Sequence, residues 1–155
     1  MTLSNPTKKT FTIRMANMML PLVQSITADI VRLADEVEQT RARLDYLNDG
    51  RVAEHTNDVY GKELHSIEKH TDRKSETVHS FVRELSELNL IPDRVVDGFV
   101  DFPALRNSEP VCLCWQLGER EVKHWHGSDE DCSQRRPVDL ELIRQSGELS
   151  FSESV

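Results

Sequence analysis

Residues Asp97–Pro137 read DGFVDFPALRNSEPVCLCWQLGEREVKHWHGSDEDCSQRRP and contain both tryptophans and all three cysteines of the chain. Three segments in and around this stretch have strand-like composition or alternation, and they cover Val95–Phe102, Val111–Leu117 and Glu121–His126. We expect Pro103 to end the first of them, because proline cannot donate to a strand ladder. Short strands so close in sequence predict a small antiparallel β-meander.

The residues before this stretch have helical spacing. Thr12 is the expected N-cap of a helix that runs to about Leu47, and a second helix is predicted from about Ala53 to Asn89. Alternating three- and four-residue steps, typical of a coiled-coil seam, connect Val23, Ile26, Ile30, Leu33, Val37, Leu44 and Leu47, with Thr40 in the one polar slot. The expected fold is therefore α+β: a long antiparallel helical hairpin over residues 12–90, followed by a small β module over residues 91–137, in a single domain.

Two details of the hairpin follow from single residues. Pro21 lacks an amide hydrogen, so it should kink the first helix, or begin a second helix after a short first one. The Asn48-Asp49-Gly50 run is a turn signal. Folding the chain about Gly50 would place Val37 near Leu64.

Such a hairpin buries one seam per helix and would be marginal alone, because helix stability in water comes mostly from packing an apolar face. We therefore expect a second copy to cover the remaining apolar surface and to form a four-helix homodimer. The alternative is a monomer with a solvated hairpin. The leading functional hypothesis is an intracellular interaction or scaffold module that self-associates through this hairpin, with any other protein partner unknown.

Composition argues against several other classes of protein. A net charge of −8 without a basic stripe argues against nucleic-acid binding. No segment approaches the roughly 20 apolar residues of a membrane span, and no export signal is apparent. An odd number of cysteines favours a reducing cytoplasm. The Ser/Glu-rich end, Ser146–Val155, is expected to be disordered.

Two pairs of residues could bind a metal. Cys112 and Cys114 are two apart on one predicted strand, and His124 and His126 are two apart on the next, so each pair shares a face. A three-residue loop at 118–120 would pair Cys114 with His124 and Cys112 with His126, and the four side chains would form a tetrahedral zinc site. A loop of two or four residues would place the histidines on the opposite face. Without a metal, both cysteines are simply small buried residues.

His126 also lies at a strand end near several charged side chains. A histidine beside carboxylates can act as a general base or a ligand, and the same groups can instead form a structural network. The candidate ligand or polar site comprises Asp101, Cys114, Glu119, His126, Asp129 and Arg135. The alternative function is thus a metal- or small-ligand-binding module that could be an enzyme. The sequence nevertheless contains no phosphate-binding loop, G-x-S-x-G or H-E-x-x-H motif. No cofactor other than zinc is indicated.

Four segments together resemble one bacterial family of uncharacterised proteins, domain-of-unknown-function family 2203. They are FTIRMANMMLPLV, GFVDFP, LCWQLGEREVKHWH and the pattern D-x5-R-x-P that ends at Pro137. The chain departs from the family pattern at Ile13-Arg14-Met15, at Asp131, and at Cys112 and His124, which stand at positions usually aromatic or apolar. The resemblance implies the boundaries of the module and carries no activity.

Overall fold

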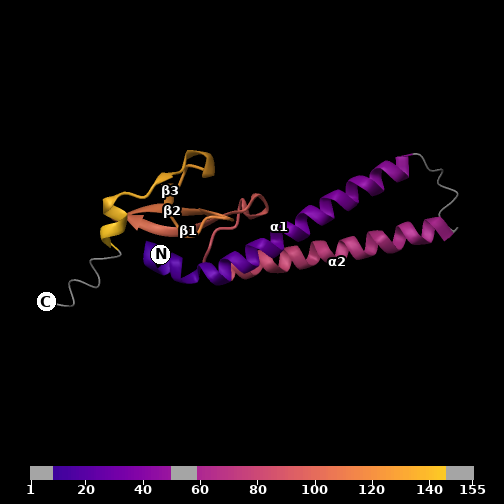
Figure 1. Cartoon of the computed structure of the whole chain (residues 1–155), viewed down its shortest axis with the longest axis horizontal. Helices are drawn as coiled ribbons and strands as arrows, with labels where there is room; N and C mark the ends of the chain where they lie inside the picture. Colours follow the sequence, from indigo (N-terminus) through magenta and orange to yellow (C-terminus); the bar gives the residue numbers. More distant parts are fainter. Residues whose placement is uncertain (1–8, 50–58, 146–155) are drawn as a thin grey trace, which may run out of the picture.

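The computed structural model of the chain describes residues 9–49 and 59–145, and its α+β architecture is the predicted one (Figure 1). Two long helices pack against each other and are followed by an antiparallel sheet, while short 3₁₀ turns η2 and η3 precede β1 and β4. The elements are α1 (Ile13–Asp49), α2 (Val59–Glu87), η2 (Val95–Asp97), β1 (Phe99–Arg106), β2 (Glu109–Gln116), β3 (His124–Gly127), η3 (Cys132–Gln134) and β4 (Arg136–Pro137).

The helical hairpin is the predicted one, but its predicted register is wrong. The four buried residues of α2 are seven apart: Leu64, Thr71, Val78 and Leu85. Between the helices, Lys74 Nζ lies 2.8 Å from Glu36 Oε1 and Arg41 Nη2 lies 3.1 Å from Asp72 Oδ1. Residue 37 therefore lies opposite the region of residue 74 and not opposite Leu64. The reason is that apolar spacing places residues on a helix face but does not fix how two helices align along their length, and the predicted start of the second helix at Ala53 lies outside the described residues.

The start of α1 agrees with the sequence. Thr12 Oγ1 accepts a hydrogen bond from the amide of Met15 at 3.1 Å, which is the predicted N-cap. One helix continues through Pro21, so the alternative of two separate helices is wrong. Figure 1 shows α1 bending in its indigo N-terminal part, as expected for a proline that removes one helical hydrogen bond.

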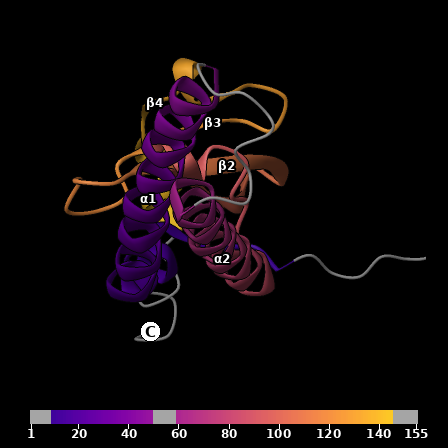
Figure 2. The same ribbon diagram turned by 90° about the vertical axis from the view of Figure 1, so that its right-hand side faces the viewer.

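The sheet has the order β1-β2-β3-β4, with every neighbouring pair antiparallel. One face of it is apolar: Val100 and Phe102 of β1 and Leu113 and Trp115 of β2 are fully buried in the core that includes the first turns of α1. Phe11 packs edge-on against Phe102, with ring centroids 5.5 Å apart. In the view along the hairpin, the two helices lie in front of the strands (Figure 2).

Two strand boundaries differ from the prediction. Val95–Asp97 forms a 3₁₀ turn that Gly98 ends at φ 92°, and β1 follows from Phe99. Pro103 does not end β1. Its carbonyl accepts a hydrogen bond from the amide of Phe11 on the outer edge, so its backbone groups point away from β2 and the missing N–H is not needed in the ladder.

The last strands also differ. Glu121–Lys123 lies outside β3, and the amide of Val122 donates instead to Asn17 Oδ1 at 2.6 Å, which ties this loop to α1. After β3, the chain forms η3 and then β4. Residues 140–145 are helical. The predicted disordered tail lies outside the described residues.

Among the described helices, none combines the length and apolarity needed to cross a membrane.

Candidate metal centre

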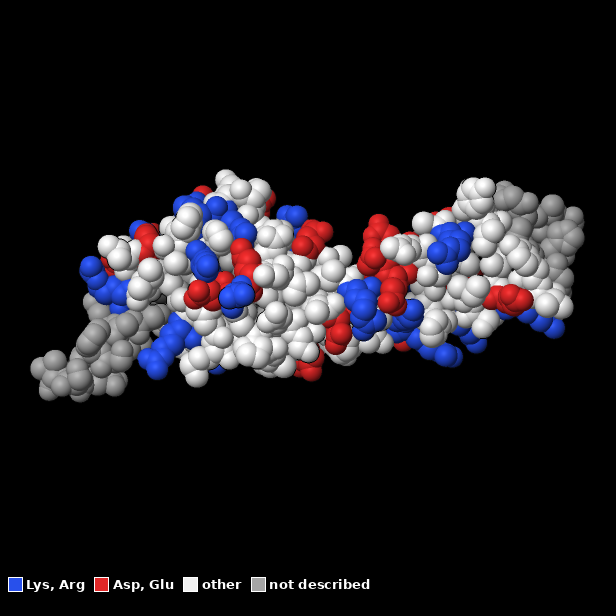
Figure 3. Space-filling model, in the orientation of Figure 1, with Lys and Arg blue, Asp and Glu red and all other residues white. Residues whose placement is uncertain are grey.

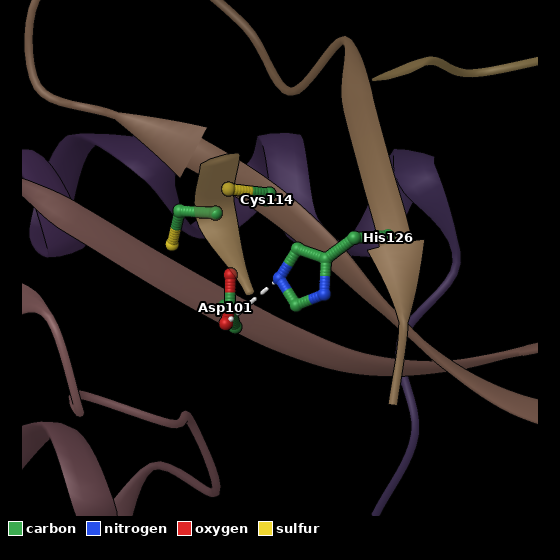
Figure 4. A group of neighbouring side chains, drawn as sticks. Asp101, Cys114 and His126 are labelled. Carbon is green, nitrogen blue, oxygen red and sulfur yellow. Dashed lines mark hydrogen bonds and ion pairs between the residues drawn. The ribbon is translucent and has the colours of Figure 1, made fainter. Parts of the chain in front are cut away.

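The sheet face opposite the core carries a small group of buried polar side chains (Figure 4). Asp101 of β1 pairs across the ladder with Cys114 of β2, and Cys114 pairs in turn with His124 of β3. His126, two residues further along β3, shares the face of His124 and lies diagonal to Cys114. Three neighbouring strands thus each contribute one side chain, and the strand ladder holds all three in place.

A fourth side chain comes from outside the strands. Cys132 begins η3, which follows β3, and it is buried. The turn is held by Asp131, whose carboxylate accepts from the amide of Ser133 at 2.9 Å, while Gln134 Oε1 accepts from the amide of Asp131 at 3.2 Å. This capping box stabilises a one-turn helix that would otherwise be too short to form alone.

The four side chains converge closely. One ligand atom each from Asp101, Cys114, His126 and Cys132 lies within 4.8 Å of all the others. A tetrahedral zinc ion with Zn–N and Zn–O bonds of about 2.0–2.2 Å and Zn–S bonds of about 2.3 Å separates its ligand atoms by about 3.3–3.8 Å. The group therefore needs only small side-chain adjustments to enclose such an ion.

The hydrogen bonds of His126 indicate what lies between it and Asp101. Its Nδ1 is 2.8 Å from the carbonyl oxygen of Gly127, which can only accept, so Nδ1 must carry a proton. In a neutral ring, Nε2 then presents a lone pair, yet it lies 3.1 Å from Asp101 Oδ2. Two acceptors at this distance require a proton or a metal cation between them. Metal-bound histidines commonly donate their other N–H to a backbone carbonyl, as His126 does.

Asp101 has an unusual environment for a carboxylate. Its side chain is only 13% exposed, and its Oδ1 is a buried oxygen without a hydrogen-bond partner. Burial raises the pKa of Asp101 above its ordinary value, and the neighbouring His126 only partly opposes this. A cation at the centre of the group would offset the cost of burying this charge.

The two thiols respond to the same environment. Burial, followed by the charge of Asp101, raises the pKa of Cys114 and of Cys132. Three acidic groups buried this close together are stable either as protonated groups or around a cation. Zinc binding deprotonates cysteine thiols, so a zinc ion would be the cation around which the deprotonated groups are stable.

A family model described as an uncharacterized conserved protein (DUF2203) matches residues 9–138. The chain belongs to the DUF2203 family. The matched region ends at Val138 and so includes all four converging residues. Neither the curated proteins nor the solved structures provide a match to the chain.

A second polar network in the DUF2203 module borders the group. Arg135 donates to both carboxylate oxygens of Glu119, at 3.1 and 2.9 Å, and its guanidinium lies over the ring of Phe99. The backbone carbonyl of Glu119 also accepts from the indole of Trp115 at 3.0 Å. Arg135 also donates to Gln116 Oε1 at 3.4 Å.

The structure thus divides the predicted polar site. Asp101, Cys114 and His126 come together, while Glu119 and Arg135 form the adjoining ion pair. Asp129 is exposed and lies outside the converging group.

The predicted metal quartet is divided in the same way. Its strand register is the observed one, with Cys112 opposite His126 and Cys114 opposite His124. Nevertheless, Cys112 and His124 lie outside the converging group, and Asp101 and Cys132 take their places. The physical reason is that the group follows one diagonal across three strands, whereas the prediction considered two strands only. His124 Nδ1 instead lies 3.5 Å from Glu119 Oε2.

Cys132 was missed by sequence reasoning. In the sequence, a cysteine within the polar run Ser128–Gln134 could have indicated a buried or ligating residue, because cysteine is seldom exposed. The structure shows that Cys132 is buried. Its distance from the other ligands depends on the path of that loop over the sheet, and no periodicity encodes that path.

Proposed function

We propose that this protein binds one zinc ion through Asp101, Cys114, His126 and Cys132. The observation that carries the proposal is the convergence of their four ligand atoms within 4.8 Å on a buried sheet face. Two thiolates, one imidazole and one carboxylate suit zinc better than magnesium or calcium, which prefer oxygen ligands alone.

The burial of the ligands favours a structural role for the ion. Cys114 is fully buried, and His126 and Cys132 are nearly so. Structural zinc sites are closed by four protein ligands, whereas catalytic sites keep one position open for water or substrate. The ion would join strands β1, β2 and β3 to the turn η3. It would thereby fix the segment that follows β3 to the rest of the sheet.

The test is metal analysis of the untagged protein, followed by cobalt substitution. We expect about one equivalent of zinc, and we expect cobalt to give the visible absorption of a tetrahedral site with thiolate-to-cobalt charge transfer. Cys114→Ser and Cys132→Ser should each lose the zinc or bind it at least about 10-fold more weakly.

The matched control uses the other cysteine and the other histidine of the same sheet face. Cys112→Ser and His124→Gln should leave zinc binding unchanged, because both residues lie outside the converging group. Protein that binds no stoichiometric transition metal would refute the proposal. Loss of zinc from Cys112→Ser, but not from the variants of Cys114 and Cys132, would show that the four proposed ligands are not the correct ones.

A second candidate function is self-association through the hairpin, which is favoured by a groove between the two helices. The groove has a volume of about 440 Å³, and its apolar floor is formed by Ala34, Val37, Ala42 and Val78. From residue 31 to residue 43, α1 has no buried side chain. We propose that α1 of a second copy fills this groove and gives a homodimer.

Charge supports a second copy as the occupant. The rim of the groove carries Glu38, Arg41 and Asp45, so it presents both signs of charge. In a two-fold arrangement, each rim meets the same surface of its partner, and an antiparallel crossing would bring Arg41 of one copy near an acidic residue of the other. Figure 3 shows Lys/Arg and Asp/Glu side chains interspersed along the hairpin on the face it presents.

Light scattering during size-exclusion chromatography over a concentration series tests this second proposal. We expect a dimer at micromolar concentration and a monomer for Val37→Glu, which places a charge in the apolar groove. Ser25→Glu adds the same charge at an exposed position of α1 and should remain dimeric. A wild-type monomer at these concentrations would contradict the proposal.

Two further expectations accompany these proposals. A cytoplasmic location is supported by free cysteines at 112, 114 and 132, because thiolate ligands persist in a reducing compartment. Binding to nucleic acid is not expected, since charges of both signs alternate over the hairpin (Figure 3). A gel-shift experiment at moderate salt would detect any such binding.

A further inference from the structure

The two cysteines of the candidate metal centre lie side by side. The sulfur atoms of Cys114 and Cys132 lie within 4.8 Å of each other, and both cysteines are buried. They are more than 12 residues apart in sequence and come from elements of different kinds, a central strand and a one-turn helix. We infer that Cys114 and Cys132 form a peroxide-sensitive pair, whose oxidation to a disulfide releases the zinc ion; this inference rests on the proposed zinc site.

The third cysteine is not placed to take part. Cys112 shares the strand and the face of Cys114, but it is outside the group whose ligand atoms converge. Two cysteines separated by one residue on a strand point the same way with their Cα atoms almost 7 Å apart, at the limit that a disulfide tolerates. Cys132 is therefore the partner that geometry offers to Cys114.

The two elements differ in how firmly they are held. Cys114 lies in the middle of the sheet, paired on one side with Asp101 and on the other with His124. The turn that carries Cys132 is held mainly by short-range hydrogen bonds, such as that from the amide of Gly127 to Glu130 Oε1 at 2.7 Å. The turn can therefore move as a unit toward Cys114 without opening the ladder of β2 and β3.

Access for a small oxidant is also better from the side of the turn. Cys114 is fully buried, whereas Cys132 is 6% exposed. Hydrogen peroxide is comparable in size to water, and oxidation of cysteines follows thiolate character and exposure. Zinc would keep both sulfur atoms as thiolates, and the more exposed Cys132 would be attacked first.

The chemistry requires one peroxide and two protons. The Cys132 thiolate attacks one oxygen of hydrogen peroxide, the O–O bond breaks, and the hydroxide that leaves takes up a proton to become water. The Cys114 thiolate then attacks the sulfenic sulfur, an S–S bond forms, and the second hydroxide leaves and is protonated to water. Two thiolates are oxidised by two electrons and hydrogen peroxide is reduced to two waters.

Loss of zinc follows from the loss of ligands. A disulfide leaves Asp101 and His126 as the only remaining donors of the group, and neither sulfur retains the charge that binds the metal. A thiol reductant would return both thiolates and restore binding. The pair would thus connect the metal content of this module to the peroxide level of its surroundings.

The experiment treats the zinc-loaded full chain with hydrogen peroxide in the presence of a chromophoric zinc chelator. We expect release of all the bound zinc, loss of two of the three thiols, and rebinding after addition of a reductant and zinc. Non-reducing peptide mapping of the oxidised wild type should show residue 114 linked to residue 132, and zinc release from Cys112→Ser should be unchanged. Cys132→His keeps four donors but cannot form the disulfide, so it should retain its zinc at the same peroxide concentration.

The possible failures are distinguishable. Untreated protein without zinc would overturn this inference together with the proposed zinc site. Zinc that stays bound while the thiols remain reduced would overturn the peroxide response alone, and so would a disulfide that contains Cys112. If Cys132→His does not bind zinc, the disulfide found in the oxidised wild type decides the matter: a link between residues 114 and 132 supports the inference, and a link to Cys112 overturns it.

Discussion

At the scale of single residues, a neutral imidazole offers one donor and one acceptor, and His126 has already used its donor on the carbonyl of Gly127. Its Nε2 therefore faces the carboxylate of Asp101 across 3.1 Å as a second acceptor. This mismatch has different consequences for the metal-free and the metal-bound forms of the group. Without a metal the carboxylate is a poor neighbour for the ring, and with a metal it is a ligand.

Asp101→Asn should therefore change metal binding and metal-free stability in opposite directions. The amide of Asn can donate to Nε2, so we expect the metal-free variant to be more stable than wild type at pH 7 by about 1 kcal/mol. We expect its zinc affinity to fall at least about 10-fold, because a ligand charge is lost. Urea unfolding in a chelator and competition with a chromophoric zinc indicator measure the two effects.

The sign of the pH dependence follows from the pKa of Asp101, which burial raises above 3.8 in the folded chain. The folded metal-free protein holds this proton more tightly than the unfolded chain, so the wild type loses stability as pH rises through the raised pKa. The gain from Asn should accordingly vanish well below pH 4. An Asn variant that binds zinc as tightly as wild type would show that Asp101 is not a ligand.

Glu119 behaves in the opposite way. Burial alone raises its pKa, but hydrogen bonds from Arg135 and from the amide of Gln116 outweigh burial, so the pKa lies below its ordinary 4.5. Its stabilising contribution is present above that value and is lost as pH falls through the lowered pKa.

Glu119→Gln should thus destabilise the protein at pH 7 by about 1 kcal/mol, a figure reduced for partial exposure. The difference from wild type should shrink as pH falls below about 4. Unfolding by urea at a series of pH values measures it. Glu121→Gln, at an exposed position in the same loop, should have no effect at any pH, and an equal effect of both substitutions would contradict the assignment.

At the scale of elements, the buried seam of α1 and α2 contains two threonines that differ in one hydrogen bond. Thr27 is fully buried and its Oγ1 has no partner, whereas Thr71 Oγ1 donates to the carbonyl of Ile67 at 2.8 Å. An unpaired buried hydroxyl costs free energy that a methyl group of the same shape does not.

We therefore expect Thr27→Val to stabilise the hairpin by about 1 kcal/mol and to raise Tm by about 2–4 °C. Thr71→Val is the matched control, since it removes a hydroxyl that is already satisfied, and it should give little or no gain. Calorimetry of the two variants measures the difference. A lower Tm for Thr27→Val would mean that its hydroxyl has a partner, such as a buried water.

How much of these elements could be predicted depended on the range of the interaction. Apolar spacing predicted the buried residues Val23, Ile26, Ile30 and Leu44 of α1, and local sequence predicted the N-cap Thr12, because both depend on residues within a few positions. The hairpin register could not be predicted, because it depends on contacts between residues far apart in sequence, such as Glu36 with Lys74. The same limit applied to Pro103, which remains in β1 because its backbone faces the outer edge.

The candidate site followed the same rule. Strand alternation placed Cys112 with Cys114 and His124 with His126, and of the alternative registers of β2 and β3 the one that brings the two pairs together is observed. The participation of Asp101 depended on the third strand and that of Cys132 on the path of a loop. Both are long-range properties, so spacing could suggest a metal site but could not name its four residues.

At the scale of the whole molecule, the chain consists of a hairpin that protrudes from a small sheet (Figure 1). Most of the hairpin is far from the candidate metal centre, and its seam is independent of it. The segment after β3 depends on the sheet for its place: β4 is only Arg136–Pro137, paired to His124 and Trp125. A zinc ion bound by Cys132 would therefore stabilise this end of the molecule much more than the other.

Chelation of the metal should consequently loosen one end of the protein and leave the other unchanged. We expect hydrogen exchange to speed up in residues 124–137 and tryptophan emission to shift to longer wavelength, because Arg136 stacks over the ring of Trp125 from the loosened segment. The α-helical circular dichroism and the exchange of residues 64–85 should stay the same, since these residues are held by the hairpin seam.

At a free zinc concentration of 100 Kd, binding contributes about 2.7 kcal/mol of stability, all of which chelation removes. Cys114→Ser should resemble the chelated wild type and be insensitive to the chelator. Equal changes in exchange along both the hairpin and the sheet would contradict this separation, because they would mean that the metal stabilises the molecule as one cooperative unit.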